Sequence, residues 1–384
     1  MKYTKIKKIN EYISKSINPM KTPNTIFEVY SVPSFSTEHP EYLRGDEIAS
    51  NKAVVKKNDV LLCKINPRIN RVWVVADESE YQNIASSEWI IIRNSDYNPE
   101  FLAWYFRNPK FKNLMISGVT GMGGSLMRAQ PKNVVEYPVP ILKREKQDEI
   151  VSILNKVARV IEFRRKEIQK LDELIKARFV ELFGDPVTNP YKWDETTVGN
   201  ECFYIKDGPH KSLPDMGKEN GGHPFISVRN IVNHTIDFST AKYISDEDYA
   251  NAIKKCHPEK GDMLYSKGGT TGIAKLIDVD IEFANWVHVA VLKFHKDKLN
   301  GIFFENMLNC DYCYGQSQRL TKGIANRDLV LSAMAQIKMY RPPIELQNQF
   351  ADFVKQVNKS KVAVQKALDE AQLLFDSLMQ EYFG

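Results

Sequence analysis

Two stretches decide the fold of this chain: residues 138–184, PVPILKREKQDEIVSILNKVARVIEFRRKEIQKLDELIKARFVELFG, and residues 338–384, KMYRPPIELQNQFADFVKQVNKSKVAVQKALDEAQLLFDSLMQEYFG. They align without a gap at an offset of 200. The alignment pairs Gln147 with Gln347, and the ending Leu182-Phe183-Gly184 with Tyr382-Phe383-Gly384. The chain is therefore a duplication of two irregular halves, each closed by the same segment.

Both copies carry apolar residues at alternating steps of four and three, which is the 3.5-residue period of a coiled-coil seam. The first seam reads Ile150, Leu154, Val157, Ile161, Arg164, Ile168, Leu171, Ile175, Arg178 and Leu182. The second reads Phe350, Val354, Val357, Lys361, Val364, Leu368, Ala371, Phe375, Leu378 and Tyr382. A helix of about 40 residues is a rod of roughly 60 Å.

The cations within the seams differ between the copies. Arg164 and Arg178 interrupt the first seam and Lys361 interrupts the second, which favours two different helices facing each other over a self-pairing dimer. The alternative is two amphipathic helices that pack on separate cores. The approach to the helix is longer in the first copy, Pro140–Gln147, than in the second, Pro343–Gln347, so we expect the two helix entries to differ in geometry.

Length and composition set the class of protein. At 384 residues and 43% hydrophobic content the chain can bury a sizeable core, and the duplication indicates two domains. The sequence starts without an apolar stretch long enough for a signal peptide, and no segment reaches the 18 or more apolar residues of a membrane span. We therefore expect a soluble, cytoplasmic protein without a membrane role.

The sequence contains only incomplete versions of the metal-binding and catalytic motifs that it resembles. Five cysteines argue against a disulfide framework, and Cys310 and Cys313 have zinc-ligand spacing without a second well-spaced pair. Residues 118–125 imitate a phosphate loop but carry glycine where lysine is essential. Residues 66–69 begin like an adenine-methyltransferase motif but lack its second proline and aromatic residue. These absences favour a binding protein over an enzyme, and we expect neither metal nor cofactor in this chain.

Each irregular half has the texture of an α+β domain. Short apolar runs bounded by Asn, Asp, Gly and Pro predict strands. In the first half these runs are Val54–Val55, Val60–Leu62, Val72–Val75 and Trp89–Ile92. Each half then turns helical, near Phe101–Phe106 and near Phe303–Leu308, before a glycine-containing stretch leads back to the long helix.

The two halves are also weak copies of each other. Lys57–Lys64 parallels Lys260–Lys267, which places Asp59 with Asp262 and Lys64 with Lys267. Directly after these lysines the sequences part. A shared frame that carries different tips is what two related sites with different specificities require.

Both tips suit a polyanion. The first offers Asn66, Arg68, Asn70 and Arg71, and arginine and asparagine side chains match the edges of guanine and adenine. The second offers Gly268, Gly269, Thr270 and Thr271, whose backbone N–H groups could meet a phosphate beside the charge of Lys267. A net charge of +5 is too small for a basic domain, so any DNA surface must be a local patch.

Other stretches combine glycines, polar donors and cations, although each could equally be an ordinary loop. The candidate DNA-contacting residues there are Gly121, Gly123, Ser125 and Arg128 in the first half, and His210, Lys211, Arg229, Asn230, Arg319 and Asn326 in the second. For His210 the alternative is a solvated turn residue.

The order of motifs resembles a known family. The second half closely resembles the specificity subunit of type I restriction-modification systems. The resemblance rests on Gly261–Gly269, Gly323–Asn326, Arg341–Phe350 and the terminal Tyr-Phe-Gly, in this order. The first half is similar to another branch of the same domain family through Asp59–Arg68, Ala85–Glu88 and Thr120–Ser125. The likeness extends over essentially the whole chain.

The resemblance implies an α+β fold in which two α/β target-recognition domains are separated by two long antiparallel coiled-coil spacer helices in a pseudo-twofold duplication. The implied domains are residues 1–142 and 185–343, and the implied spacer helices are residues 143–184 and 344–384.

The resemblance also implies a non-catalytic subunit that reads a bipartite target in double-stranded DNA. Its implied partners are two methyltransferase subunits and two restriction (translocase) subunits, which use S-adenosylmethionine, ATP and magnesium. Two rival hypotheses stay open from the residues alone: a single-chain methyltransferase or nuclease with a cryptic site, and a coiled-coil scaffold without a DNA role.

Overall fold

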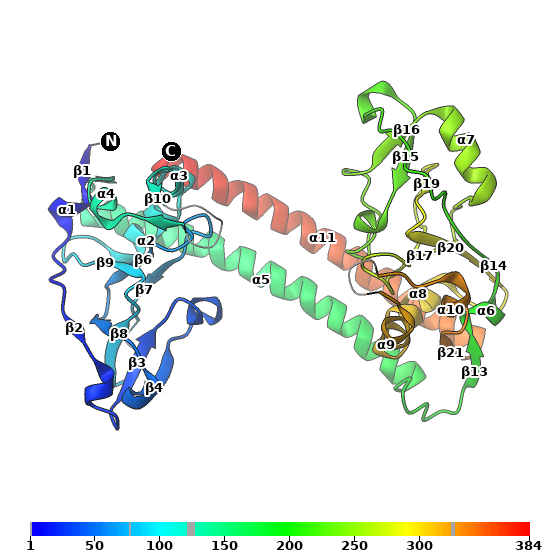
Figure 1. The fold of residues 1–384 in the computed structure, drawn as a ribbon, viewed down its shortest axis with the longest axis horizontal. Coiled ribbons are helices and arrows are strands. Elements are labelled where there is room, and N and C mark those ends of the chain that lie inside the picture. Colours follow the sequence, from blue (N-terminus) through cyan, green and yellow to red (C-terminus); the bar gives the residue numbers. More distant parts are fainter. Residues whose placement is uncertain (1, 77, 121–126, 324–326) are drawn as a thin grey trace. The chain divides into compact units, whose positions relative to one another are not determined.

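A computed structural model describes residues 2–76, 78–120, 127–323 and 327–384 (Figure 1). The chain divides into two compact units. One unit is built from two separate parts of the sequence, and the other is the segment between them. The first unit is Met1–Arg165 with Lys366–Gly384, and the second is Lys166–Gln365. Each long helix therefore contributes residues to both units.

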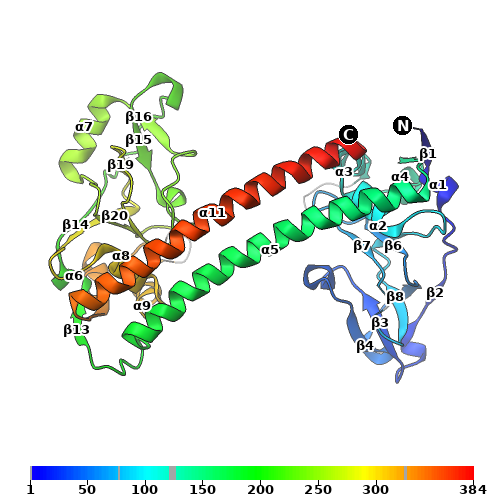
Figure 2. The ribbon, with the colours of Figure 1, turned by 180° about the vertical axis from the view of Figure 1, so that it is seen from behind.

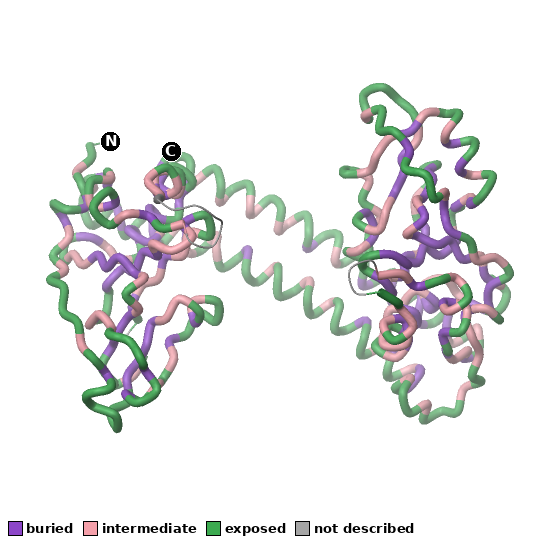
Figure 3. The backbone as a smooth tube through the Cα atoms, viewed as in Figure 1, coloured by how far each residue is buried: buried purple, intermediate pink, exposed green. Residues whose placement is uncertain are grey.

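The two long helices confirm the prediction from the seam. Helix α5 covers Arg144–Phe183 and helix α11 covers Ile344–Phe383, both 40 residues long. Every seam position in either helix is buried or half-buried, while most positions between them are exposed (Figure 3). The expected difference in helix entry is wrong, because the two helices begin and end at positions matched by the offset of the duplication.

Within each unit the helices run antiparallel (Figures 1 and 2). In the second unit Asp172 forms an ion pair with Lys361, and the guanidinium of Arg178 lies 5.7 Å from the ring centre of Phe353. In the first unit Arg165 donates a hydrogen bond of 3.4 Å to Gln372. Two of the three seam cations, Arg178 and Lys361, therefore contact residues of the facing helix.

The first unit is built mainly from short strands. Its strands are β1 (Tyr3–Lys5), β2 (Ser16–Ile17), β3 (Ile26–Tyr30), β4 (Glu41–Arg44), β5 (Lys52–Val54), β6 (Val60–Cys63), β7 (Val72–Val74), β8 (Gln82–Ala85), β9 (Trp89–Ile92), β10 (Val119–Thr120), β11 (Arg128–Ala129) and β12 (Pro138–Pro140). Its short helices are α1 (Ile6–Ile9), α2 (Pro99–Arg107), α3 (Pro109–Ser117) and α4 (Pro131–Val134), with 3₁₀ turns η1 (Pro19–Lys21), η2 (Ser34–Thr37) and η3 (Gly45–Glu47). The predicted apolar runs all lie in or beside these strands.

The second unit repeats this plan. Its strands are β13 (Asp194–Thr197), β14 (Cys202–Asp207), β15 (His223–Ile226), β16 (Lys242–Ile244), β17 (Met263–Ser266), β18 (Ala274–Leu276), β19 (Ala284–Asn285), β20 (Val289–Phe294) and β21 (Lys338–Arg341). Its helices are α6 (Val198–Glu201), α7 (Asp246–Lys255), α8 (Gly301–Asn309), α9 (Asp311–Leu320) and α10 (Leu331–Met334), with 3₁₀ turns η4 (Lys218–Asn220) and η5 (Val228–Asn230).

Matched strands pair in the same way in both units. The described strands place β6 antiparallel between β7 and β9, and β17 antiparallel between β18 and β20. The strand before each long helix pairs with the first strand of its unit, β1 with β12 and β13 with β21. The fold is therefore α+β and duplicated, as predicted.

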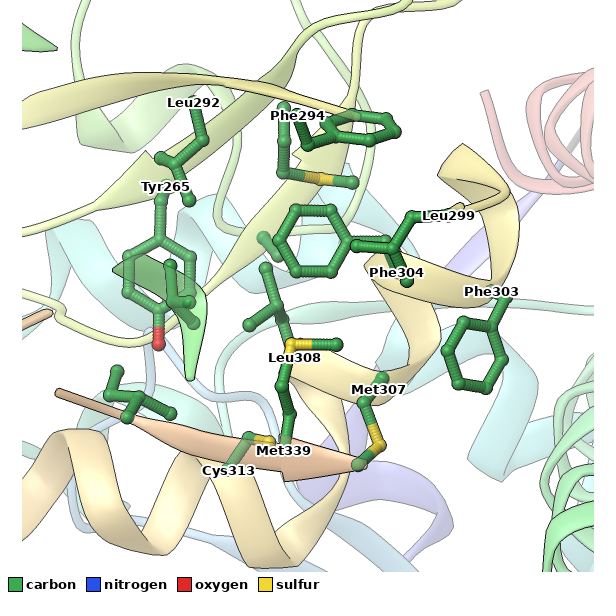
Figure 4. Close-up of a cluster of buried hydrophobic side chains, with 14 of the residues drawn as sticks. Tyr265, Leu292, Phe294, Leu299, Phe303, Phe304, Met307, Leu308, Cys313 and Met339 are labelled. Carbon is green, nitrogen blue, oxygen red and sulfur yellow. The ribbon is translucent and has the colours of Figure 1, made fainter. Parts of the chain in front are cut away.

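The ends of the long helices belong to the unit cores. In the second unit the ring of Phe303 on α8 lies 4.8 Å from Phe183 of α5, and Phe183 lies 5.5 Å from Phe350 of α11. In the first unit Phe101 of α2 lies 5.6 Å from Phe383 of α11. Truncating one such ring to alanine costs about 3–5 kcal/mol. The core of the second unit continues through the sheet and helices α8 and α9 (Figure 4).

Among the described helices, none combines the length and the apolar character that a membrane span requires.

Candidate nucleic-acid interface

The first tip is a tight turn after β6. Asn66 and Asn70 adopt left-handed backbone angles, φ 46° and 51°, which asparagine tolerates better than most residues. The Asn66 N–H donates to the carbonyl of Met127 over 2.8 Å, and the Asn70 side chain donates to the Phe106 carbonyl over 3.2 Å. This bonding holds the turn in place and leaves Arg68 exposed at its outer end.

The cations around the first tip are accessible. Arg71 is half-buried, and Lys64 donates to the Ser87 carbonyl over 2.6 Å. Arg128 forms a two-pronged pair with Glu88, at 3.3 and 3.1 Å, and remains 45% exposed. The sequence analysis did not single out Glu88 as a partner, although it lies within a motif that supported the family resemblance.

The second tip differs from the expectation at Lys267. Its side chain is only 7% exposed and lies 2.9 Å from Asp328 and 3.5 Å from Asp207. Lys255 also binds Asp207, at 2.8 Å. A buried ammonium group requires such partners because burial without them is very costly. Lys267 therefore serves the frame of the second unit, and the structure gives it no open face toward a phosphate.

The glycine N–H groups of the second tip also bind within the protein. The N–H groups of Gly268, Gly269 and Gly272 donate to carbonyls of His288, Arg327 and Ser266, at 3.3, 3.0 and 2.9 Å. The Thr271 hydroxyl is buried against that of Thr321, at 2.9 Å. Gly269 and Thr270 are exposed, so the outward surface of this tip consists of these two residues.

The remaining candidates in the second unit divide by exposure. His210 is 75% exposed with its Nε2 atom 3.8 Å from Asp207, and Lys211 and Arg319 are also exposed. Arg229 is exposed and donates to the Thr240 carbonyl over 2.7 Å. Asn230 differs: its side chain accepts from the Ser227 N–H at 2.8 Å and donates to the Asp237 carbonyl at 2.8 Å.

Asn230 is 1% exposed, so the structure assigns it to holding a turn rather than to contacting a ligand. Gly121, Gly123, Ser125 and Asn326 lie outside the described residues.

Behind both tips lies the same backbone frame. Three backbone hydrogen bonds recur at matched positions. In the first unit they run from Lys64 N to Glu88 O, from Ala129 N to Lys64 O and from Asn66 N to Met127 O. In the second unit they run from Lys267 N to His288 O, from Leu329 N to Lys267 O and from Gly269 N to Arg327 O. Their lengths are 2.7–3.0 Å in both units. The shared frame expected from the sequence is therefore present, and the tips differ only in what they add to it.

A buried carboxylate supports each frame. Asp59 accepts two hydrogen bonds of 2.6 Å from Arg93, and the bond to Asp59 raises the pKa of that guanidinium. Asp262 accepts one of 2.6 Å from Lys293. Burial by itself would lower the pKa of Lys293, but its bonds to Asp262 and Glu259 raise it. Asp59 and Asp262 occupy equivalent positions in the two frames, as the sequence comparison predicted. The cations that bind them were not predicted.

Among the residues that the structure describes, no three His, Cys, Asp or Glu side chains are grouped so as to hold a metal ion, the pair Cys310 and Cys313 included. The accessible groups are hydrogen-bond donors and cations on rigid turns, which is chemistry for binding a polyanion.

Comparisons with known proteins agree with this chemistry. Residues 200–371 match the family model described as type I restriction modification DNA specificity domain. Over 100% of this chain and 96% of the other, the fold is similar to the S subunit of a type I restriction-modification system from M. genitalium, with 14% identity and a TM-score of 0.58.

A second solved chain comes from work on complex assembly and conformational transition of a type I R-M system. It shares 18% identity with a TM-score of 0.56, over 100% of this chain and 97% of that one. At these identities the likeness shows the fold, and it covers both units and both long helices.

Proposed function

We propose that this chain, in which residues 200–371 match the family model described as type I restriction modification DNA specificity domain, is a sequence-reading subunit for a bipartite DNA target. Each unit reads one short half-sequence, and helices α5 and α11 set the distance between the two readings. The observation that carries the proposal is the pair of matching backbone frames with different side chains at their tips. Two separate half-sequences add their discrimination, at about 1–3 kcal/mol for each base pair read.

The charges at the tips support DNA as the ligand. Arg68, Arg71 and Arg128 supply donors in the first unit, and arginine matches both phosphates and the guanine edge. His210, Lys211 and Arg319 supply exposed donors in the second. Such groups fix the protein on the backbone of the duplex and read base edges from there.

The proposed partners are two methyltransferase subunits and two restriction subunits, and the chain itself is non-catalytic. The methyl donor, ATP and magnesium then belong to those partners. Exposed apolar side chains on the long helices support a docking role: Phe163 and Leu373 in the first unit are 65% and 70% exposed, and Val362 in the second is 71% exposed. Apolar groups on a solvent-facing helix are typical of a surface that a partner covers.

The experiment that tests the proposal is sequencing of methylated bases in a host with and without this chain. The expected result is a split, adenine-methylated motif that disappears on deletion. An unchanged methylation pattern in a methylation-competent host would overturn the proposal. Binding of the methyl donor by the isolated chain would instead favour a single-chain methyltransferase.

A further inference from the structure

A second pair of matched turns accompanies the tips. Residues 86–89 link β8 to β9, and residues 286–289 link β19 to β20. Both turns have the same two backbone hydrogen bonds. In the first unit these run from Trp89 N to Ser86 O and from Ser86 N to Tyr30 O. In the second unit they run from Val289 N to Trp286 O and from Trp286 N to Ile226 O. The backbone is the same in the two units, whereas the side chains change from serine and glutamate to tryptophan and histidine.

The turn of the second unit borders its tip directly. Besides the bond from Lys267 N to the His288 carbonyl, the imidazole lies against Gly268 so closely that a Cβ atom there would be 2.0 Å from Nδ1. The rings of Trp286 and His288 meet edge to face with centres 4.9 Å apart. A side chain at position 268 would therefore collide with the His288 ring.

Each of the two rings has one buried nitrogen atom. Trp286 Nε1 and His288 Nδ1 are buried without a hydrogen-bond partner among the described residues. Lys267, whose N–H donates to the His288 carbonyl, forms its ion pairs with Asp328 and Asp207. An indole N–H that has lost water and gained no acceptor is costly, so such groups call for a ligand or a rearrangement.

The first unit shows the contrast at the matched position. There Glu88 occupies the place of His288, and both its carboxylate oxygens accept from Arg128. In the second unit the residue matched to Arg128 is Asp328, which binds Lys267 instead. The side chain of His288 therefore has no counterpart of the tie between Glu88 and Arg128, although its carbonyl remains in the frame.

We propose that Trp286 and His288 are specificity-determining residues of the second unit, which turn toward DNA and hydrogen-bond to base edges of its half-sequence. The indole N–H is a donor only, so it selects an acceptor, such as purine N7, guanine O6 or thymine O4 in the major groove. The imidazole is a donor or an acceptor according to its tautomer. This inference rests on the proposed function and names residues within it.

The test replaces the chain in a host whose methylated motif depends on it. Trp286→Phe keeps an aromatic ring and removes the N–H, and His288→Ala removes the imidazole. Each variant is expected to lower discrimination about 10- to 100-fold at one position of the second half-sequence, while the first half-sequence stays intact. Ser86→Ala, at the matched turn of the first unit, is the control and should leave the second half-sequence unchanged.

Thermal unfolding of each purified variant shows that the fold is kept, and His288→Gln replaces His288→Ala if that variant unfolds. A motif unchanged in both Trp286→Phe and the position 288 variant would overturn the inference and leave the proposed function standing. Equal relaxation of both half-sequences would also overturn it. Should deletion of the whole chain leave methylation unchanged, the proposed function fails and this inference with it.

Discussion

Gln147 and Gln347, placed 200 residues apart, make the same two kinds of hydrogen bond in the two units. Gln147 Oε1 accepts from the Asn98 N–H at 2.8 Å and its Nε2 donates to the Leu142 carbonyl at 2.9 Å. Gln347 Oε1 accepts from the Asn300 N–H at 2.9 Å and its Nε2 donates to the Pro342 carbonyl at 2.7 Å. Each glutamine thus ties the start of a long helix to the residue that caps α2 or α8.

The first prediction concerns this tie. Gln347→Ala leaves a buried N–H and a buried carbonyl unpaired, so we expect a loss of about 2–4 kcal/mol in the free energy of unfolding. Urea unfolding followed by circular dichroism measures it. Gln169→Ala, at an exposed position of α5, is the control and should change stability by less than about 0.5 kcal/mol. Equal effects of the two variants would show that the hydrogen bonds of Gln347 do not stabilise the fold.

The second prediction separates the two matched lysines. Lys267→Met leaves Asp328, which is 44% exposed, without its cation, while Asp207 keeps Lys255 at 2.8 Å and His210 at 3.8 Å, so we expect about 1–3 kcal/mol of destabilisation. Lys64→Met removes only a bond to a carbonyl at a half-exposed site and should cost under about 1 kcal/mol. Chemical unfolding of both variants decides the matter. A mild effect at Lys267, accompanied by a shallower salt dependence of DNA binding, would restore a phosphate-binding role for it.

The third prediction concerns the division of reading between units. Arg68→Ala combined with Arg71→Ala removes two cations from the first tip, so one half-sequence should be read more weakly and the other should stay unchanged. The methylated motif of a host carrying the variant provides the readout. The salt dependence of binding should also become shallower, by about one for each phosphate that the variant no longer neutralises. Disturbance of both half-sequences to the same degree would contradict a model of two independent readers.

The fourth prediction follows from thiol chemistry. Burial raises the pKa of Cys202 to about 12 and that of Cys256 to about 11, whereas a hydrogen bond with Cys313 lowers the pKa of Cys310. Only the thiolate reacts with an alkylating reagent. At pH 8 a thiol of pKa about 11 is ionised in roughly one molecule in a thousand, and each further pH unit raises that fraction about tenfold.

Iodoacetamide at pH 8, followed by mass spectrometry of peptides, should therefore modify Cys310 before Cys202 and Cys256. In guanidinium chloride the cysteines should react at similar rates, which is the control for intrinsic reactivity. Faster modification of Cys256 than of Cys310 in the folded protein would mean that the burial around Cys256 is breached in solution.

The fifth prediction tests the long helices as a spacer. Four residues inserted near Arg164 lengthen α5 by about 6 Å, which corresponds to between one and two base pairs of the duplex. The variant should recognise the same two half-sequences at a longer separation, because neither tip is altered. Since four residues also break the heptad register, circular dichroism must first show a folded variant. An unchanged separation would assign the spacing to something other than α5.

Most of the architecture could be predicted from local sequence patterns. The 3.5-residue period needs no tertiary information, because it records which face of each helix is apolar, and it predicted the burial of every seam position. The duplication likewise predicted the matching frames around Asp59 and Asp262. The 200-residue offset of the long helices pairs Glu88 with His288 and Arg128 with Asp328, so the alignment could have identified these partners of the tips, although they were not predicted.

The sequence by itself determined two duplicated α+β units, two long helices and two frames with different tips, because periodicity and repetition are properties of the chain. Only the tertiary structure decided which tip residues are free. Lys64 and Lys267 follow matched strands, yet one is half-exposed and the other is buried between Asp207 and Asp328, each about 60 residues away along the chain. A local pattern cannot reveal such partners, because the charge that a buried lysine must find is supplied by whichever strands the fold brings beside it.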